Sequence, residues 1–266
     1  MVKNSFQNKT ILITAGSKGI GFAIAKEFLK RGANVGISSR NFENLSKAKK
    51  FLLKFSSKDK ILTLKHDLNN TKDIKKLFLK TEKFFKSSVD ILINNSGGPP
   101  PKLISEISNK DLESALNVNL KSAIYASNYA VKEMKKKKWG RIINLTSTTA
   151  KEPAKKMCLS NISRAALTSF GKTLSLEAGE FGVTVNTILT GGVLTDRLKN
   201  LIRLRIKNTN LSLNKEIEKI SNNIPVGRIA SPDEFIHLII FLASEEASYI
   251  NGTAIPLDGG TSKSIF

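Results

Sequence analysis

The sequence predicts a single doubly wound α/β domain, built on a seven-stranded, mostly parallel sheet with helices on both faces. The chain has 266 residues, a length that suits one large α/β domain with a substantial core. Short β-branched runs alternate with helical patterns from end to end, and this alternation indicates parallel strands joined by crossover helices. Since no repeat or low-complexity linker divides the chain, we expect residues 1–266 to form one domain.

The expected strands are short, apolar and rich in β-branched residues. They lie at residues 10–14, 34–38, 61–66, 90–94, 141–145, 183–189 and 253–257. Between them, residues 73–85 give a typical helical pattern, with apolar side chains on one face and lysines on the other. Residues 195–225 break the rhythm with a long amphipathic helical insert, which we expect to form a lid near the carboxyl edge of the sheet.

The chain is strongly basic, with a formal net charge of +21. Lysine accounts for 35 of the 43 cationic side chains, and the lysines are spread along the whole chain. No basic stripe with interleaved aromatic residues and no zinc-finger spacing is present, so we expect no specific nucleic-acid partner. The charge indicates a solvated surface whose positive field also helps to collect anionic ligands such as nucleotides or acyl carriers.

The remaining composition narrows the class of protein further. One cysteine, Cys158, excludes an internal disulfide, and together with the lack of a secretory signal it favours a cytoplasmic location. No apolar run approaches the roughly 18 residues of a membrane span, so we expect no membrane association. His66 and His237 lack ligand spacing, and we expect no metal site.

A glycine-rich turn follows the first expected strand, in the sequence TAGSKGIGFAIAKEFLKRG at residues 14–32. Gly16, Gly19 and Gly21 allow a tight turn, close approach of the backbone to a pyrophosphate, and close packing of helix on strand. Free N–H groups at the start of the following helix are suited to bind phosphate oxygens. We therefore expect a Rossmann dinucleotide site here, with Ser17, Lys18 and Ile20 also at the cofactor.

The second and third expected strands end in residues that bear on cofactor choice. The second strand ends in SSRN, with Arg40 where an acidic residue would bind the ribose 2′-hydroxyl of NAD. Arg40 and Lys18 together favour a 2′-phosphate, so we expect NADP(H), with NADPH preferred over NADH. The third strand ends in HDL, where Asp67 is placed to accept from the adenine amine, beside Leu68. The alternative is that these are ordinary surface residues of a very basic protein.

Several of these segments resemble the short-chain dehydrogenase/reductase family, in one colinear order over the whole chain. TAGSKGIG is similar to the TGxxxGIG turn of the family, with Ala15 where the first glycine usually stands. NNSG at residues 94–97 is similar to the NNAG segment, which implies that Asn94 braces the central strand and that Asn94, Ser96 and Gly97 lie at the cofactor. VNTILTGGVLT resembles the segment that closes over the nicotinamide, which implies contacts from Val193 and Thr195.

The resemblance also implies an active site in which two residues differ from the family pattern. NVNL provides Asn119 and INLTS provides Ser147 at the places of the active-site asparagine and serine. The Tyr-x-x-x-Lys pair of the family falls about 13 residues after the serine, where this chain has Ser160 and Arg164. A serine is a far weaker acid than a tyrosine phenol, and an arginine stays protonated, so cofactor binding should survive better than proton transfer.

On local pattern alone, Ser160 and Arg164 are explained as a helix N-cap and a solvated arginine. The wider resemblance is to a 3-oxoacyl-carrier-protein-reductase-like subgroup with an imperfect glycine turn and an incomplete catalytic tetrad. It implies an NADP(H)-dependent oxidoreductase that reduces a carbonyl such as a 3-oxoacyl thioester, or oxidises the matching alcohol. Ser147 would polarise the oxygen, water held by Ser160 and Asn119 would replace the tyrosine, and Arg164 would bind ribose hydroxyls.

An alternative function remains open on the same residues. Loss of the Tyr/Lys pair favours a dinucleotide-binding protein without redox turnover, acting as a sensor or as a subunit of an assembly. Under either function, the resemblance implies a homo-oligomer, a tetramer or a dimer. The partner of the enzyme would be a small-molecule or carrier-bound acyl substrate.

Overall fold

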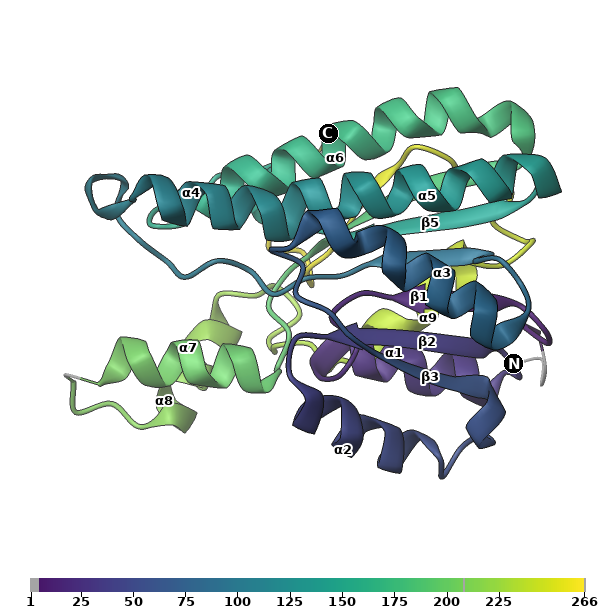
Figure 1. The fold of residues 1–266 in the computed structure, drawn as a ribbon. Helices are drawn as coiled ribbons and strands as arrows, with labels where there is room; N and C mark the ends of the chain where they lie inside the picture. The colour runs from purple at the N-terminus through teal and green to yellow at the C-terminus, as the bar shows by residue number, and fades with distance from the viewer. Residues whose placement is uncertain (1–4, 208, 266) are drawn as a thin grey trace.

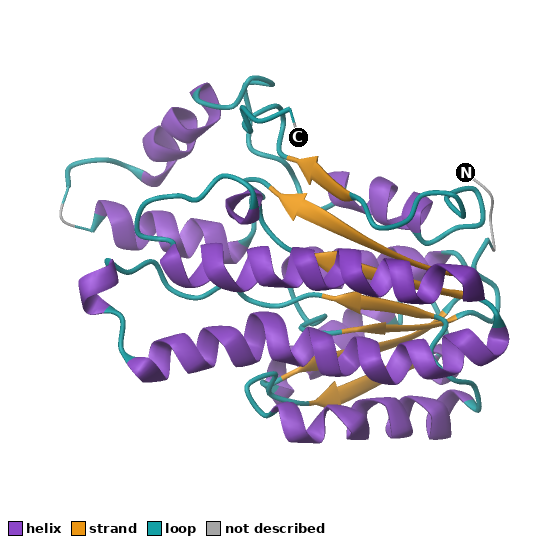
Figure 2. Ribbon diagram, turned by 90° about the horizontal axis from the view of Figure 1, so that it is seen from above, coloured by secondary structure: helices purple, strands orange, loops and turns teal. Residues whose placement is uncertain are grey.

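Seven strands of the described residues form one sheet in the order β3-β2-β1-β4-β5-β6-β7. The strands are β1 Thr10–Ile13, β2 Asn34–Ser39, β3 Ile61–Lys65, β4 Ile91–Asn94, β5 Gly140–Leu145, β6 Val183–Thr190 and β7 Ala254–Leu257. Every neighbouring pair is parallel, and one end of each strand differs from its expected range by one residue. The computed structural model describes residues 5–207 and 209–265 and confirms the predicted fold class (Figure 2).

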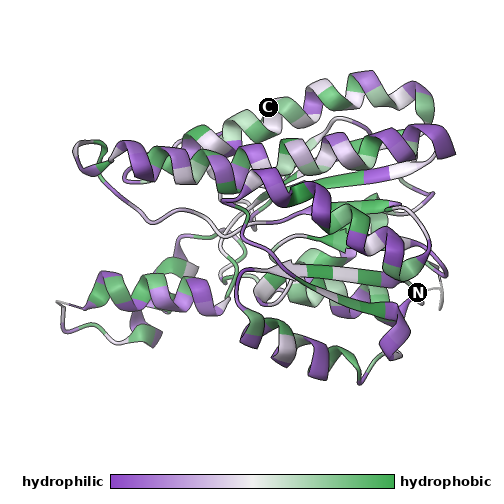
Figure 3. Cartoon of the chain, in the orientation of Figure 1, coloured by the Kyte–Doolittle hydropathy of each residue, from purple (hydrophilic) through white to green (hydrophobic). Residues whose placement is uncertain are grey.

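Helices cover both faces of the sheet. They are α1 Gly19–Lys30, α2 Phe42–Leu52, α3 Ile74–Phe85, α4 Asn109–Leu116, α5 Ser122–Lys137, α6 Cys158–Ala178, α7 Asp196–Ile206, α8 Leu213–Asn222 and α9 Glu234–Leu242. Shorter turns are η1 Lys58–Lys60, η2 Thr71–Asp73, η3 Ile104–Glu106, η4 Asn117–Lys121, η5 Thr148–Ala150 and η6 Gly179–Phe181. One apolar cluster joins α1, α2 and α9 to the sheet, and a second joins α3, α5 and α6 to the other face. Apolar stripes alternate with polar ones along these helices (Figure 3).

The strand order reverses between β1 and β4, which places a crevice at their carboxyl ends. Chain segments leave β1 and β4 toward helices on opposite faces of the sheet (Figure 1). Ligands of open α/β sheets bind at such a switch point. The fold therefore provides the crevice in which the predicted site residues lie.

Helix α6 packs unusually close to the sheet at Gly171. A Cβ added to Gly171 would lie 2.8 Å from Nδ2 of Asn144 on β5 and 3.0 Å from Oγ1 of Thr187 on β6. No side chain therefore separates the helix from these strands at this point. The first turns of α6, which carry Ser160 and Arg164, lie toward the carboxyl end of β5, because the Arg164 guanidinium donates to the carbonyl of Leu145.

The predicted lid is a pair of helices, α7 and α8, that stands out from the body of the domain (Figure 1). Thr195 and Ser212 cap their N-termini through their side-chain oxygens. Arg205 of α7 and Glu216 of α8 form an ion pair at 3.4 Å, and Ile202 is buried. Residue 208 of the expected insert lies outside the described residues. Within the described chain, no helix combines the length and apolar character that a membrane-spanning segment needs.

Candidate active site

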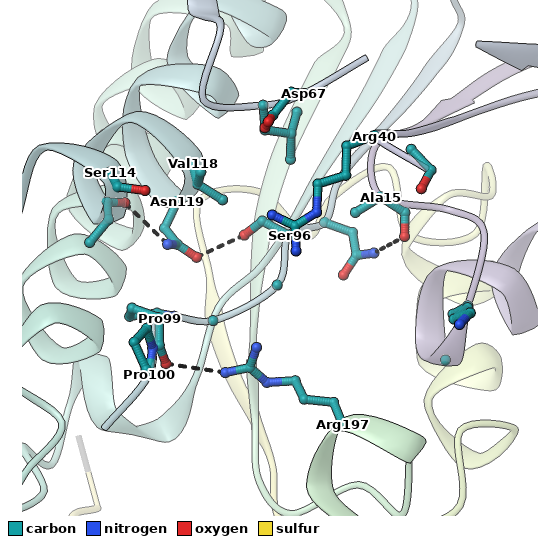
Figure 4. A pocket seen from close by; sticks show the side chains of 18 of the residues that line it. Ala15, Arg40, Asp67, Ser96, Pro99, Pro100, Ser114, Val118, Asn119 and Arg197 are labelled. Atoms are coloured by element: carbon teal, nitrogen blue, oxygen red, sulfur yellow. Dashed lines mark hydrogen bonds between the residues drawn. The ribbon is translucent and has the colours of Figure 1, made fainter. Parts of the chain in front are cut away.

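A cavity of about 630 Å³ occupies the crevice at the carboxyl ends of the strands (Figure 4). Its walls come from the segments that follow β1 to β4, from α4 and η4, and from the start of α7. Eleven of the predicted site residues line it: Ser17, Lys18, Gly19, Ile20, Arg40, Asp67, Leu68, Ser96, Gly97, Asn119 and Thr195. The structure thus brings together residues that are more than 170 positions apart in the chain.

The glycine-rich turn is held in a strained but well-supported conformation. Ala15, at the place of the family's first glycine, has a positive φ of 47°, and Gly19 has a φ of 56°. The side-chain amide of Asn95 donates to the carbonyls of Thr14 and Ala15, both at 3.1 Å. Helix α1 starts at Gly19 with no side-chain cap and no acidic residue in its first turn. Its first N–H groups are therefore suited to bind an oxyanion.

Five predicted cofactor residues do not line the cavity: Gly16, Gly21, Asn94, Arg164 and Val193. Of the predicted catalytic residues, Ser147 and Ser160 also do not line it. A Cβ on Gly21 would lie 2.9 Å from the carbonyl oxygen of Ala15, so only glycine fits beneath the turn. Asn94 is buried and donates to the Ser127 hydroxyl at 2.9 Å and to the Asn144 side chain at 2.8 Å. Its amide joins β4 to β5, whereas the next residue, Asn95, reaches the cavity.

Two cations, Lys18 and Arg40, lie at the end of the cavity where the sequence predicts the adenine. The side chains of Lys18 and Arg40 are exposed, line the cavity and form no ion pair among the residues that the structure describes. Asp67 lies nearby at the end of β3 (Figure 4). His66 also lines this end, and its buried Nε2 has no hydrogen-bond partner in the described chain. Burial lowers the pKa of His66, partly offset by the carboxylates of Asp67 and Asp73, so the imidazole is neutral at pH 7.

Asn119 lies in a π-helical turn, η4, between α4 and α5. Its side chain is 2% exposed, its Nδ2 donates to the Ala115 carbonyl at 3.1 Å, and its Oδ1 accepts from the Ser96 hydroxyl at 2.9 Å (Figure 4). Single π-turns inside helices occur frequently at functional sites. Here the turn presents an asparagine side chain to the cavity wall beside the loop that follows β4.

Thr149 lies between Ser147 and Ser160, and none of these three residues is among those that line the cavity. The Ser147 Oγ accepts from the backbone N–H of Thr149 at 3.2 Å, and the Thr149 Oγ1 lies 3.3 Å from the Ser160 Oγ. Ser160 is 4% exposed, and its neighbour Leu159 lines the cavity. Helix α6 begins at Cys158, and its N-cap is Met157 without a side-chain bond. The interpretation of Ser160 as an N-cap is therefore wrong: it is a buried hydroxyl linked to Ser147 through Thr149.

Arg164 is 5% exposed, so the interpretation as a solvated arginine is also wrong. Its Nη1 donates to the carbonyl of Leu145 at 2.9 Å, and its Nη2 donates to the carbonyl of Ser96 at 3.5 Å. The Nε is buried without a partner in the described chain. Burial, together with the positive charge of Arg197, lowers the pKa of Arg164 to about 10. The guanidinium therefore stays protonated at neutral pH.

Thr149 and Arg197 are candidate functional residues that the sequence pattern did not point to. Arg197, in the first turn of α7, lines the cavity and donates from Nη2 to the carbonyl of Pro99 at 3.3 Å (Figure 4). Its place in the sequence could have pointed to Arg197, because it follows the predicted cofactor residue Thr195 by two residues. No local signal existed for Thr149, whose role depends on the packing of η5 against α6. The described residues contain no group of three or more His, Cys, Asp or Glu side chains placed to bind a metal ion.

Known proteins resemble this chain over nearly its full length. A family profile described as enoyl-(acyl carrier protein) reductase matches residues 14–262. The NADPH-dependent reductase BacG of Bacillus subtilis is 32% identical over 257 residues, covering 97% of this chain and 99% of BacG. The 3-oxoacyl-[acyl-carrier-protein] reductase FabG of Buchnera aphidicola is 33% identical over 254 residues, covering 96% of this chain and 97% of FabG. Among solved structures, L-sorbose reductase of Gluconobacter frateurii, in complex with NADPH and L-sorbose, matches with a TM-score of 0.93 at 28% identity, covering 99% of this chain and 100% of that chain.

Proposed function

Because the chain belongs to the short-chain dehydrogenase/reductase family, we propose that it is an NADPH-dependent reductase of a carbonyl compound. The substrate skeleton we propose is that of a 3-oxoacyl group, by analogy with FabG and its relatives. One observation supports this most: a single cavity joins an uncapped helix N-terminus, Lys18 and Arg40 to Asn119 and to Leu159, the residue before Ser160. The reverse oxidation of the matching alcohol uses the same site.

The residues at the two ends of the cavity fit NADPH. The N–H groups at the start of α1 suit the diphosphate, and Arg40 and Lys18 suit the 2′-phosphate. His66 provides, beside Asp67 and at the place expected for adenine, a ring whose buried Nε2 has no hydrogen-bond partner in the described chain. When bound, the cofactor supplies a hydride. The chain's own residues orient the carbonyl and the water that gives a proton to its oxygen, and the resulting hydroxide takes a proton back from solvent.

Ser147, Asn119, Ser160 and Arg164 are the residues to which we assign this chemistry. Ser147 donates a hydrogen bond that polarises the carbonyl oxygen, while a water held by Ser160 and Asn119 provides the proton. Thr149 lies between the two serines: its backbone N–H donates to the Ser147 Oγ, and its own hydroxyl lies 3.3 Å from the Ser160 Oγ. Arg164 holds ribose hydroxyls as a fixed cation, and with a pKa of about 10 it does not donate the proton itself at pH 7. We therefore expect slow turnover compared with a tyrosine-dependent enzyme.

The test is a fluorescence titration of the protein with NADPH and NADH, followed by NADPH consumption with a 3-oxobutanoyl thioester and a simple 3-oxo ester. Tight NADPH binding with slow reduction of either compound supports the proposal. Tight binding without turnover of any carbonyl substrate favours the alternative, a dinucleotide-binding sensor or assembly subunit, which the absence of the tyrosine also favours. A protein that binds neither cofactor has neither function.

A homo-oligomer is part of the same proposal. Helices α5 and α6 carry the apolar side chains Tyr125, Ile162 and Leu176, which are 45%, 46% and 72% exposed. We expect a dimer or tetramer to cover part of this surface. Light scattering coupled to size-exclusion chromatography measures the mass directly, and a monomer at micromolar concentration contradicts this part of the proposal.

A further inference from the structure

The C-terminal segment, residues 258–264, folds back beside the loop that follows Ser147. It leaves β7, which pairs in parallel with β6, so it emerges at the carboxyl edge of the sheet. The last residues of a domain are usually poorly ordered unless contacts hold them. Here the Asp258 side chain accepts from the backbone N–H groups of Gly260 and Ser262, at 2.9 and 2.8 Å. These bonds fold the segment into a compact turn.

The same segment packs against two other parts of the carboxyl edge. The backbone N–H of Gly191, in the segment that the sequence predicts to close over the nicotinamide, donates to the Leu257 carbonyl at 3.0 Å. The backbone N–H of Val226, four residues after the end of α8, donates to the Gly259 carbonyl at 3.2 Å. The chain end is therefore built into the region around the predicted reaction site.

Glu152 holds the end of this segment through its side chain. Its Oε1 accepts from the backbone N–H groups of Lys263 and Ser264, both at 2.7 Å. Hydrogen bonds to an ionised carboxylate are shorter and stronger than those between neutral groups. Both donors belong to the backbone, so the contact does not depend on which side chain stands at residue 263.

A hydrogen-bonded turn connects Glu152 to Ser147. The backbone N–H of Glu152 donates to the Thr148 carbonyl at 2.9 Å, and that of Thr149 donates to the Ser147 Oγ at 3.2 Å. The second bond uses a lone pair of the Oγ, so the hydroxyl proton stays available to a substrate oxygen. The turn is η5, a 3₁₀ helix of three residues with Ser147 as its N-cap. Because such short turns have poor hydrogen-bond geometry, neighbouring contacts decide their conformation.

We propose that Glu152 is a positioning residue: by binding the backbone of residues 263–264, it fixes the turn that carries Ser147 and thereby the place of the Ser147 hydroxyl. The inference rests on the proposed function for the reaction in which this hydroxyl acts. It adds a role for the C-terminal segment, which contributes no group to the chemistry and acts through the turn.

The experiment separates the Glu152 contact from the rest of the segment. The variants are Glu152→Ala, a chain that ends at Ser262, and the two changes combined, while Glu152→Gln keeps an acceptor oxygen. Lys263→Ala is the matched control, because it keeps both backbone donors. A second control is Glu180→Ala, which removes an exposed carboxylate before the start of β6, at the other end of that strand.

The measurements are kcat and KM with NADPH and a 3-oxo ester, NADPH affinity, Tm, and hydrogen exchange of residues 147–152 in the free protein. Glu152→Ala and the shortened chain should each lower kcat about 5-fold or more, because a small displacement of a reacting group is costly. Exchange at residues 147–152 should become faster in both, while KM and NADPH affinity stay unchanged. The combined variant should lose no more than either alone, since both remove one interaction. Glu152→Gln should retain most of the rate, and both controls should behave like the unmodified protein.

Losses that multiply in the combined variant, or an unchanged kcat in Glu152→Ala, overturn the inference. A fall in kcat that is matched by weaker NADPH binding and a lower Tm also overturns it, because Glu152 would then only stabilise the fold. Failure of the proposed function gives a different result, since the unmodified protein then shows no turnover. In that case hydrogen exchange decides: faster exchange of residues 147–152 in both variants supports the held turn, and equal exchange overturns it.

Discussion

Restoring a tyrosine and a lysine in α6, with Ser160→Tyr and Arg164→Lys, tests whether this helix carries the proton-transfer site. A phenol is a much stronger acid than an alkanol, and general acid catalysis contributes about 10²–10⁴-fold. The structure also indicates how much stability the added ring should cost. Ser160 is 4% exposed and contacts Thr149, so a ring in place must displace its neighbours or enter the cavity next to Leu159. Overpacking of this kind costs about 1–3 kcal/mol.

The lysine replaces two guanidinium hydrogen bonds, to the carbonyls of Leu145 and Ser96, with those of a single ammonium. Together the changes should lower Tm by several degrees, at about 2–4 °C per kcal/mol for a chain of this size. The reduction rate with a 3-oxo ester should still rise at least 10-fold. The matched control is Ser160→Phe with Arg164→Lys, which adds the same ring without the hydroxyl.

The assay is NADPH consumption under saturating cofactor, with Tm and NADPH affinity measured for all three proteins. Equal rates for the tyrosine and phenylalanine variants, when both bind NADPH as the unmodified protein does and a crystal structure places the ring at the cavity, would refute the assignment of Ser160. The serine would then be a buried packing residue of α6.

Three further predictions test other parts of the molecule. Arg40→Asp should reduce the preference for NADPH over NADH by about 10-fold or more, because a charge-assisted bond to the 2′-phosphate is lost. Fluorescence titration measures the two affinities, with Arg203→Asp as the control, and an unchanged preference contradicts the prediction. Gly171→Ala should lower the free energy of unfolding by about 1–3 kcal/mol, because its Cβ would meet Asn144 and Thr187; urea denaturation measures it, and Gly192→Ala, whose nearest neighbour is at 3.8 Å, should change little. Glu234→Gln should destabilise the protein at neutral pH but not in strong acid, because hydrogen bonds from Arg228 lower the pKa of Glu234 from 4.5 to about 2. The stabilisation by the ionised Glu234 carboxylate is complete above pH 4.5 and is lost as the pH falls through about 2. Melting curves of both proteins across this range measure it, and a difference in Tm that does not change with pH would contradict the prediction.

The sequence was sufficient for the sheet because the inner strands β1, β4, β5 and β6 are almost entirely buried and are rich in β-branched and other apolar residues. The edge strands β3 and β7 are partly exposed. The glycine-rich turn was equally readable, since its position after β1 fixes its structure. Arg164 was harder to place. It lies three residues before Leu167 on the buried face of α6, so its position in the helical pattern indicated burial, while its charge indicated solvent.

The arrangement of the site depended on contacts between segments far apart in the chain. Thr149 links Ser147 to Ser160 only because η5 packs against α6. Arg197 meets Pro99 across the cavity only because α7 starts beside the loop after β4. Such contacts follow from the assembled fold, and no spacing within the sequence announces them. The roles assigned to the predicted site residues stay predictions until the variants are measured.

The close packing of α6 at Gly171 has a consequence for how this protein tolerates mutation. At 1.5 Å per residue, Gly171 lies about 16 Å along the helix from Ser160. A side chain larger than alanine there would push α6 away from β5 and β6, and the same rigid helix would carry Ser160 and Arg164 away from Ser147. Random mutagenesis should therefore recover inactive but folded proteins altered far from the cavity. Conversely, small volume changes at the residues facing Gly171 offer a way to adjust the depth of the reaction site without touching any group in it.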